Sequence, residues 1–385
     1  MGNRVAIVGV GQTDHSSSRK DVNGRELIYE AVSRALIDAD ITIDKVDAFV
    51  IGNMDHFEAI NYTDMWSIGG SGAYMKPIFK VCTGGTTGTS VATSGFFHVA
   101  SGLFDVVLAI AWEKNSESDT TGAIITATEP IWDRFSYAGA LPSLATEASA
   151  YMEAYGITER DAALVSVRDR KHACNNPHAH LRQAISVQDV LDSPMLSYPI
   201  KFWDICPRSD GACAVVFASE HRAEKMCHRP AWIQTTQNRH DYAWLSDIDF
   251  TKMETLKDAA AAAYEDVGIT EPLKQIDVME LYLPYSYAGL KWIEVMGLAK
   301  PGESPRLIED GVTDMDGELP INPSGGVIST NCIGATGLLR VAEIALQLMG
   351  RAEKRQVPDA KVGLATGFGG AFWSDVLILG DSKPV

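Results

Sequence analysis

The chain has 385 residues, which is enough for two domains or for one large two-part fold with a substantial core. Its formal net charge of −17 and pI near 4.9 argue against a nucleic-acid partner, because phosphate backbones are bound through basic patches. No signal peptide and no apolar run of about 18 residues are visible, so we expect a cytoplasmic protein without a membrane span, and six reduced cysteines without a CxxC pair.

The first part of the chain alternates apolar strands with helices. We predict a strand at residues 5–10 and an amphipathic helix at 25–40, whose apolar residues recur at helical spacing. Apolar runs predict further strands at 46–53, 77–81 and 104–112. Residues 85–102, between the last two strands, are rich in Gly, Ser, Thr and Ala and carry almost no charge, which favours a helix packed closely on all sides.

Residues 115–205 have a different composition. They begin with polar and helical segments, including "YMEAYGITERDAALVSVRDRKHACNNPHAH", and continue into loops that contain proline. We interpret them as an inserted cap with a solvated surface, followed by a return to the core. Its His172, Cys174, His178 and His180 fit no standard zinc spacing, so we expect no metal in this chain.

The remaining residues repeat the order of the first part. Strands are predicted at 212–219 and 231–236. They are followed by an amphipathic helix at 254–269, a strand at 277–284, a small-residue helix at 334–350 and a hairpin at 361–380. The two small-residue helices open with "GTTG" and "GATG". We therefore predict an α/β fold with two duplicated halves, 1–114 and 206–385, and the cap 115–205 between them. Two mixed sheets would enclose the small-residue helices.

Three glycine-rich motifs suggest different chemistry. "GVGQTD" lacks the third glycine of a dinucleotide fingerprint, and "GGTTGTS" lacks the lysine of a phosphate loop, so neither predicts a nucleotide site. In "NPSGGVISTNCIGATG", Gly325 and Gly326 permit close backbone approach, and Asn331 and Cys332 precede a helix. A helix N-terminus lowers a thiol pKa and stabilises oxyanions. From the residues alone, a reactive Cys332 and a buried structural cysteine are equally consistent.

Several stretches together resemble the thiolase superfamily over essentially the whole chain. They are "VAIVGVGQTD", "VASGLFDVVLAIAWEK", "GELPINPSGGVIST", "IGATGLLRVAEIALQLMG" and "ATGFGGAFWSDVLIL". The resemblance is greatest to sterol-carrier-type thiolases and to relatives that work with a small zinc-ribbon/OB-fold subunit. It implies a thiolase-like five-layered αβαβα fold, a homodimer, that small partner subunit, and coenzyme A as a substrate.

The sequence departs from the family at its reactive positions. The family's nucleophilic cysteine corresponds to Gly85, with Cys82 three residues earlier. The histidine of the Gly-His-Pro motif has no match, and Asn331 and Cys332 stand in its place. Tyr282 replaces the His or Asn of the second-half motif, and the second catalytic cysteine would fall near Gly367.

The resemblance leaves two reactions open. The first is thiolysis of a 3-oxoacyl-CoA, as in enzymes that cleave aromatic substrates such as benzoylsuccinyl-CoA, with attack by Cys82, by Cys332 or by CoA itself. The second is retro-aldol cleavage of a 3-hydroxyacyl-CoA, as in steroid side-chain aldolases, which this chain resembles in "RKHACNNPHA", Gly85 and Tyr282. The motifs "GELPINPSGG" and "STNCIGATG" favour thiolysis. A catalytically silent scaffold that binds acyl-CoA is the third alternative.

The predicted site lies where the loops around Gly85, Tyr282 and Asn331 meet. We predict these roles: catalytic, Tyr282, Cys332, Asn331, Cys82 and His56; backbone donors to an oxyanion, Gly85, Gly367 and Gly369; contacts to CoA, Ser324, Gly325 and Gly326. In this site, backbone amides and side-chain donors would stabilise the oxyanion, and catalysis would depend on them in place of the family's usual nucleophile and base.

Overall fold

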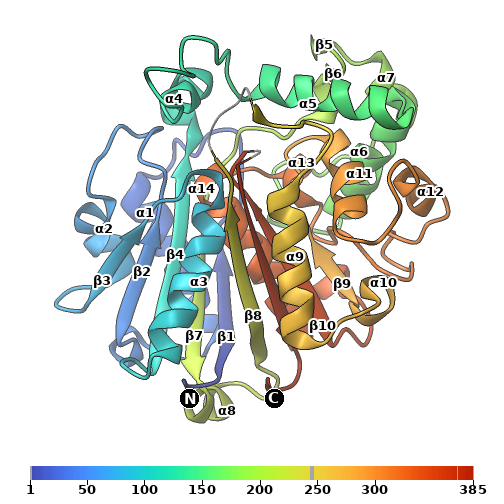
Figure 1. The fold of residues 1–385 in the computed structure, drawn as a ribbon. Helices are drawn as coiled ribbons and strands as arrows, with labels where there is room; N and C mark the ends of the chain where they lie inside the picture. The colour runs from blue at the N-terminus through green and yellow to red at the C-terminus, as the bar shows by residue number, and fades with distance from the viewer. Residues whose placement is uncertain (1, 243–246, 371, 385) are drawn as a thin grey trace.

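The computed structural model describes residues 2–242, 247–370 and 372–384, which form a nine-stranded mixed sheet covered by helices (Figure 1). The strand order is β3-β2-β4-β7-β1-β8-β11-β10-β9. The bounds are β1 Val5–Gln12, β2 Ala48–Gly52, β3 Ile78–Val81, β4 Val106–Lys114, β7 Asp210–Ser219, β8 Ala231–His240, β9 Val278–Glu280, β10 Val362–Phe368 and β11 Trp373–Gly380.

The two halves of the sheet repeat one topology. The order β2-β4-β7-β1 in the first half corresponds to β9-β10-β11-β8 in the second. β2 and β4 are parallel, as are β9 and β10, and the pairs β4-β7, β7-β1, β10-β11 and β11-β8 are antiparallel. β3 adds a further parallel strand beside β2 at the edge of the first half. The predicted duplication is therefore confirmed. The expectation of two separate sheets is corrected, because Ala6 pairs with Trp232 and Ile7 with Ala231, which joins the halves at β1 and β8.

Helices α3 (Thr87–Ala100) and α14 (Ile333–Met349) pack against each other and are the two predicted small-residue helices. Their glycines permit this approach, because a Cβ on Gly88 would overlap the backbone nitrogen of Leu338, and one on Gly337 would lie 2.6 Å from that of Thr89. Every residue of α14 from Gly334 onward is buried. The expectation that α3 is packed on all sides is wrong for this chain, since α3 packs on α14 and the sheet but its Phe97 is 56% exposed.

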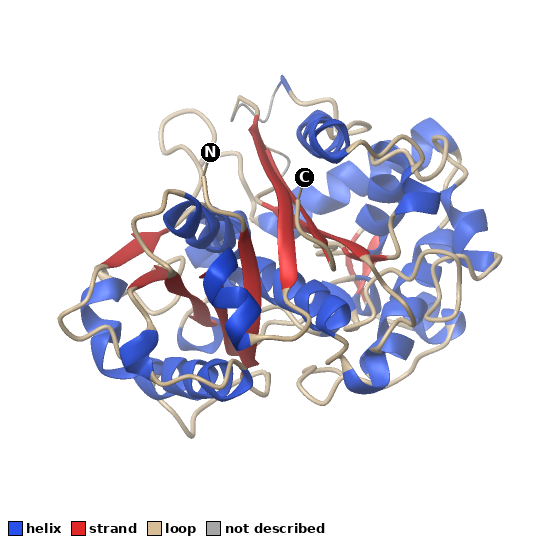
Figure 2. Ribbon diagram, turned by 90° about the horizontal axis from the view of Figure 1, so that it is seen from below, coloured by secondary structure: helices blue, strands red, loops and turns tan. Residues whose placement is uncertain are grey.

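Helices α1 (Gly24–Asp38) and α9 (Glu254–Val267) form the outer layers. A capping box of Asn23 and Glu26 starts α1, and its Leu27 and Ile28 are buried against the first half of the sheet. α9 packs on β8 and β11 of the second half. The contacts therefore order the layers from α1 through one half-sheet, the pair α3 and α14, and the other half-sheet to α9. Figure 2 shows helices on both sides of the strands.

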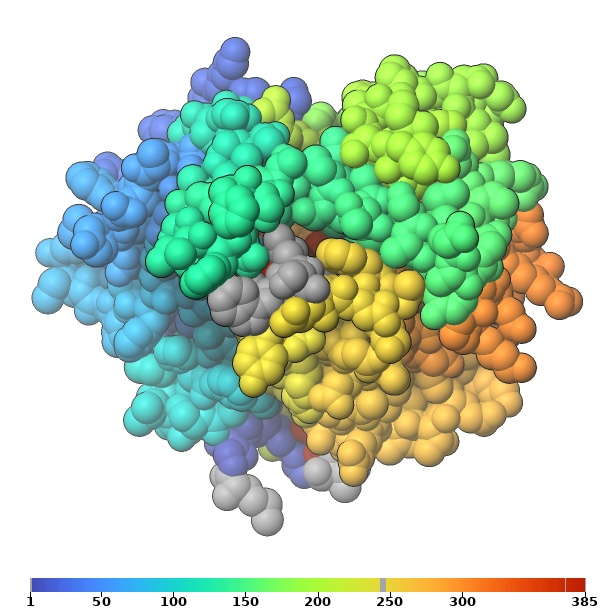
Figure 3. All heavy atoms as spheres, turned by 45° about the horizontal axis from the view of Figure 1, so that its top comes forward, coloured from blue at the N-terminus to red at the C-terminus, as the bar shows by residue number. Residues whose placement is uncertain are grey.

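The cap lies between β4 and β7 in the chain and across one end of the sheet (Figure 1). Its green residues spread over the upper part of the surface in the space-filling view (Figure 3). It contains α4 (Thr120–Ile125), α5 (Ala140–Tyr155), α6 (Glu159–Ala173), α7 (Val187–Asp192), β5 (Met195–Ser197) and β6 (Ile200–Lys201). The expectation of a solvated surface is wrong for α6. Its Arg168 and Asp169 form a buried ion pair, and the Arg170 guanidinium lies 4.7 Å from the Trp203 ring centroid. The helix packs on α11, α12 and α13, which removes these side chains from solvent.

Strand β7 lies after the predicted boundary at residue 206, yet it is hydrogen-bonded between β4 and β1 of the first half. The chain thus returns from the cap to the first half before it enters the second. The remaining helices are α2 (Thr63–Ser71), α8 (Glu220–Met226), α10 (Pro272–Gln275), α11 (Ser286–Val295), α12 (Ser304–Glu309) and α13 (Gly326–Ser329). Over the described residues, no helix is both long and apolar enough to cross a membrane.

Candidate active site

The loops that carry Gly85, Tyr282 and Asn331 lie together. The backbone of Gly85 packs against the carbonyl group of Phe368, at the end of β10. The Phe368 ring lies 6.1 Å from the Tyr282 ring, centroid to centroid. The Tyr282 hydroxyl is 3.4 Å from Asn331 Oδ1. Elements from both halves of the fold therefore converge here.

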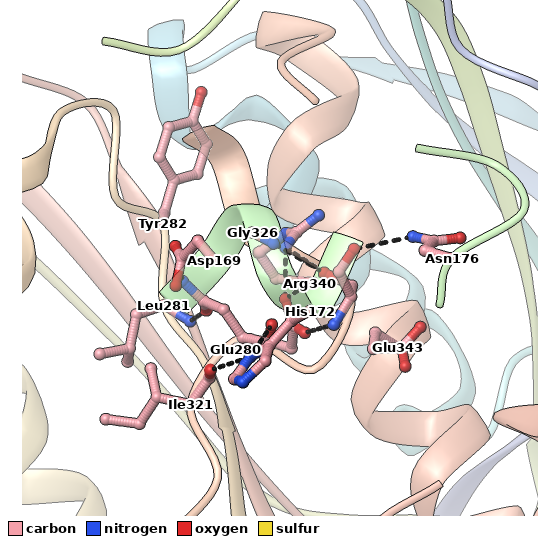
Figure 4. A network of polar contacts seen from close by, with 12 residues as sticks. Asp169, His172, Asn176, Glu280, Leu281, Tyr282, Ile321, Gly326, Arg340 and Glu343 are labelled. Atoms are coloured by element: carbon pink, nitrogen blue, oxygen red, sulfur yellow. Dashed lines mark hydrogen bonds and ion pairs between the residues drawn. The ribbon is translucent and has the colours of Figure 1, made fainter. Parts of the chain in front are cut away.

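Tyr282 follows β9 and is held by its backbone. Its N–H donates to Thr366 Oγ1 at 2.8 Å, and the preceding Leu281 N–H donates to Asn322 Oδ1 at 2.7 Å. The ring points away from the ion pair of Glu280 and Arg340 (Figure 4). Burial raises the pKa of Tyr282 far above its ordinary value. The hydroxyl therefore stays protonated near neutral pH and serves as a hydrogen-bond donor.

Asn331 is fixed by contacts on its amide and on its backbone. Its Oδ1 accepts from Thr336 Oγ1 at 2.9 Å, and its Nδ2 donates to Cys206 Sγ at 3.1 Å. Its backbone N–H donates to Ser209 Oγ at 3.1 Å, and its carbonyl accepts from Asn115 Nδ2 at 3.1 Å. These partners come from three separate segments, so the amide has one preferred orientation.

Position 85 has no room for a side chain. A Cβ on Gly85 would overlap the carbonyl oxygen of Phe368 and would lie 3.3 Å from Gly369 Cα. Gly367 is equally enclosed, because a Cβ there would overlap Thr89 Oγ1. At Gly369 the side chain of Trp373 fills the corresponding space. The two positions at which the family places cysteines are thus closed by neighbouring atoms. The oxyanion roles of the three glycines stay a prediction.

We expect Gly85→Ala to lower the free energy of unfolding by about 1–3 kcal/mol, the usual cost of overpacking. Chemical denaturation measures the change. Gly69→Ala is the matched control: nothing lies within 4 Å of a Cβ at this helical position, so alanine is expected to stabilise slightly. Unchanged stability of Gly85→Ala would contradict the steric argument. By the same argument, Gly85→Cys is not expected to create a working nucleophile.

The two cysteines predicted as nucleophiles occupy different environments. Cys82 follows β3, is exposed, and its Sγ lies 4.0 Å from the Met54 carbonyl oxygen. Cys332 is fully buried, with its Sγ 3.3 Å from His15 Nδ1. Burial raises the Cys332 pKa well above its ordinary value. A buried neutral thiol is a poor nucleophile, so the geometry does not favour attack by Cys332, and the role of Cys82 stays a prediction.

The buried His15 predicts an acid-sensitive fold. Burial lowers its pKa from 6.5 to about 3, so below about pH 6.5 the unfolded chain binds a proton that the folded protein does not. This group then lowers the free energy of unfolding by about 1.4 kcal/mol per pH unit until the pH approaches 3. Denaturation at a series of pH values should show a shallower slope for His15→Gln. An equally steep slope in this variant would contradict the prediction, and the exposed His221→Gln is the control.

His56 belongs to a loop held by the buried Glu113 carboxyl group and the half-buried Glu58 carboxyl group. Asn53 Nδ2 donates to Glu113 Oε1 at 2.6 Å and to Glu58 Oε2 at 3.2 Å. Glu113 Oε2 also accepts from Gly334 N–H at 3.0 Å, which ties this loop to the start of α14. Burial raises the pKa of both glutamates and lowers that of His56. The catalytic role of His56 stays a prediction.

Ser324, Gly325 and Gly326 lie in a buried turn. The Ser324 N–H and hydroxyl both donate to Glu280 at 2.9 Å, and Arg340 Nη1 donates to Ser324 Oγ at 2.7 Å. Both glycines have positive φ angles, 89° and 60°, which glycine adopts without strain. The turn is thus anchored on a buried ion pair, and its predicted contact with CoA stays a prediction.

Sequence reasoning missed the residues that orient Asn331. Cys206 and Ser209 stand in "CPRSDGACAVV", where polar residues precede a buried apolar strand, and Asn115 directly follows β4. Polar residues at the ends of buried strands were the feature of the sequence that could have pointed to them. Because these partners lie more than 100 positions from Asn331 in sequence, only the fold brings them together. In the described ranges, no group of three or more His, Cys, Asp or Glu side chains is arranged to hold a metal ion.

Comparison with known proteins gives a consistent assignment. The family model "Thiolase, N-terminal domain" matches residues 5–192, and "Thiolase C-terminal domain-like" matches residues 237–381. An acetyl-CoA acetyltransferase of Methanothermobacter thermautotrophicus is 34% identical over 372 residues, which cover 95% of this chain and 96% of the relative. The benzoylsuccinyl-CoA thiolase subunit BbsB of Thauera aromatica is 28% identical over 373 residues, with 95% of each chain covered.

A solved structure extends the likeness to three dimensions. The Ltp2-ChsH2(DUF35) aldolase superposes with a TM-score of 0.83 at 27% identity, over 98% of this chain and 97% of the matched chain. The matched models, the relatives and the duplicated sheet agree with one another over nearly the whole length. This chain therefore belongs to the thiolase family.

Proposed function

We propose that this chain cleaves a carbon–carbon bond of a 3-hydroxyacyl-CoA by a retro-aldol reaction, releasing an aldehyde or ketone and a shorter acyl-CoA. The closure of position 85 carries this proposal, because a nucleophilic side chain has no room there. A retro-aldol reaction needs no covalent acyl-enzyme. It needs a base for the hydroxyl proton and hydrogen-bond donors for the thioester enolate. The proposal departs from thiolysis, which the sequence motifs favour.

In the proposed reaction the substrate hydroxyl loses its proton and becomes the new carbonyl group. The bond between Cα and Cβ breaks, and its electron pair moves into the thioester as an enolate. Tyr282, protonated because burial raises its pKa, donates its hydroxyl hydrogen bond to the enolate oxygen. The Asn331 amide lies beside that hydroxyl and adds a second polar group next to the enolate.

The likeness to the Ltp2-ChsH2(DUF35) aldolase supports this reaction and suggests a second component. We extend the proposal to the assembly: a homodimer of this chain bound to a small zinc-ribbon/OB-fold subunit. Any structural zinc would then belong to the partner. Size-exclusion chromatography with light scattering measures whether this chain is a dimer and whether it binds the small subunit. A monomer that does not bind the small subunit would contradict the proposed assembly.

Thiolysis of a 3-oxoacyl-CoA is the second candidate. The relatives named acetyl-CoA acetyltransferase and benzoylsuccinyl-CoA thiolase subunit favour it. With position 85 closed, CoA thiolate would attack the ketone directly, and the same enolate would leave. Both candidates therefore place the developing negative charge at Tyr282 and Asn331.

The two candidates are separated by offering each substrate to the purified complex. Release of a ketone or aldehyde from a 3-hydroxyacyl-CoA, without free CoA, supports the lyase. Release of a shorter acyl-CoA from a 3-oxoacyl-CoA, only when free CoA is added, supports thiolysis and overturns the retro-aldol proposal. If neither substrate is cleaved in the presence of the small subunit, the chain is a silent acyl-CoA-binding scaffold.

We expect Cys82→Ala to keep its kcat within about threefold of wild type, because the proposed reaction uses no covalent intermediate. Steady-state kinetics on the preferred substrate measure the change. Loss of turnover by a factor of about 100 or more would identify Cys82 as the nucleophile or as a proton-transfer group. Mass spectrometry of a quenched reaction would then be expected to find an acyl group on this peptide.

A further inference from the structure

Cys206 lies in the candidate active site, although the predicted mechanism gives it no role. Its backbone N–H donates to the Pro284 carbonyl at 3.0 Å, which fixes it to the loop that follows Tyr282. Its Sγ accepts from Asn331 Nδ2 at 3.1 Å. Cys206 is half-buried, whereas Cys213, Cys227 and Cys332 are buried in the core.

Tyr282 and Cys206 flank one amide group. The Tyr282 hydroxyl lies at Asn331 Oδ1, and the Cys206 thiol lies at Nδ2 of the same side chain. In an amide, one carbon carries both the oxygen and the nitrogen. In a thioester enolate, one carbon likewise carries the oxygen and the α-carbon, so the α-carbon takes the place that the nitrogen has in the amide. A thioester enolate lying beside this amide would therefore present its oxygen to the tyrosine and its α-carbon to the thiol.

We propose that Cys206 is a further catalytic residue, whose thiol delivers the proton that the acyl-CoA enolate takes up at its α-carbon after the carbon–carbon bond has broken. The inference rests on the proposed function, and it applies to both candidate reactions because both release the same enolate. The step breaks the S–H bond and forms a C–H bond at Cα. The thiolate then regains a proton from water. The proton given up to water is that of the substrate hydroxyl in the retro-aldol reaction and that of the CoA thiol in thiolysis, so no net proton is consumed.

The thiol has the protonation state that this role requires. Burial raises the pKa of Cys206 to about 11, so it carries its proton at neutral pH. A protonated thiol is still far more acidic than the α-carbon of a thioester, so it can protonate the enolate, and it would act as a nucleophile only after losing that proton. Cys206 is thus suited to the end of the reaction, when the enolate is present.

Hydrogen exchange at the α-carbon tests the proposal directly. Acetyl-CoA or propionyl-CoA is incubated in D2O with the purified complex, and deuterium at Cα is followed by mass spectrometry. Wild type is expected to exchange this hydrogen, and Cys206→Ala to exchange it at least about 100-fold more slowly, as is typical for loss of a general acid or base. Cys227→Ala is the matched control, because its Sγ also accepts an N–H, from Arg351 Nη2 at 3.3 Å, away from the site.

Cys206→Ser separates proton delivery from simple orientation of Asn331. A serine hydroxyl can accept the Asn331 hydrogen bond but is a much weaker acid than a thiol. Slow exchange in both variants supports the proposal. Exchange at the wild-type rate in Cys206→Ala, full recovery in Cys206→Ser, or a wild type that cleaves without exchange overturns it. Failure of the wild type to cleave either substrate would instead refute the proposed function.

Discussion

Tyr282→Phe is expected to lower kcat by about 100-fold with little change in KM, because the hydroxyl is proposed to stabilise charge that exists only as the bond breaks. The fold is expected to survive. Asn331 Oδ1 keeps its hydrogen bond from Thr336 Oγ1, and the phenylalanine ring keeps the packing against Phe368. Steady-state kinetics on the substrate that wild type cleaves measure the effect, and thermal denaturation checks the fold.

Tyr264→Phe is the matched control for this variant. Its hydroxyl also donates a hydrogen bond, in this case to the Met296 backbone carbonyl at 3.2 Å, but it lies on α9 away from the site. Its removal is expected to leave kcat unchanged. If Tyr282→Phe retained more than about a third of wild-type kcat while folded, the hydroxyl would not be an enolate donor, since such donors contribute 100-fold or more.

The duplicated α/β fold was predictable because local patterns carry most of its information. Apolar runs located β2 and β4, and amphipathic spacing located α1 and α9. The small residues of "GATG", which open α14, predicted a closely packed helix, and Gly337 makes the contact with α3 possible. The link between β1 and β8, and the place of β7 in the first half, could not be read from the sequence, since strand pairing is long-range.

The candidate site was only partly predictable for the same reason. Gly85, Tyr282 and Asn331 could be singled out because each departs from a family motif, and the structure brings their loops together. The environment of a cysteine, however, depends on contacts far away in the chain. Sequence reasoning therefore proposed Cys332, which lies against His15 in the core, and passed over Cys206, which lies against Asn331.

A buried ion pair beneath the site predicts the largest change in stability. Arg340 on α14 contacts Glu280 on β9 (Figure 4), and both are almost completely buried. Ser324 hydrogen-bonds to both. Glu280 lies two residues before Tyr282, so the pair also anchors the strand that positions the tyrosine. Removing one partner would leave the other charge buried without compensation.

Arg340→Met is expected to lower the free energy of unfolding by about 3–5 kcal/mol, the usual cost of leaving one member of a buried pair alone. Adding Glu280→Gln to this variant is expected to recover a large part of the loss, because the free-energy cost of burying a neutral amide is smaller than that of burying a carboxylate. Chemical denaturation of the two single variants and the double variant gives the coupling free energy. Arg160→Met is the control, since Arg160 and Glu309 form an exposed pair and its unfolding midpoint should not move. Equal stability of Arg340→Met and wild type would mean that the Glu280 carboxyl is held by Ser324 alone and that the ion pair is not the anchor of this strand.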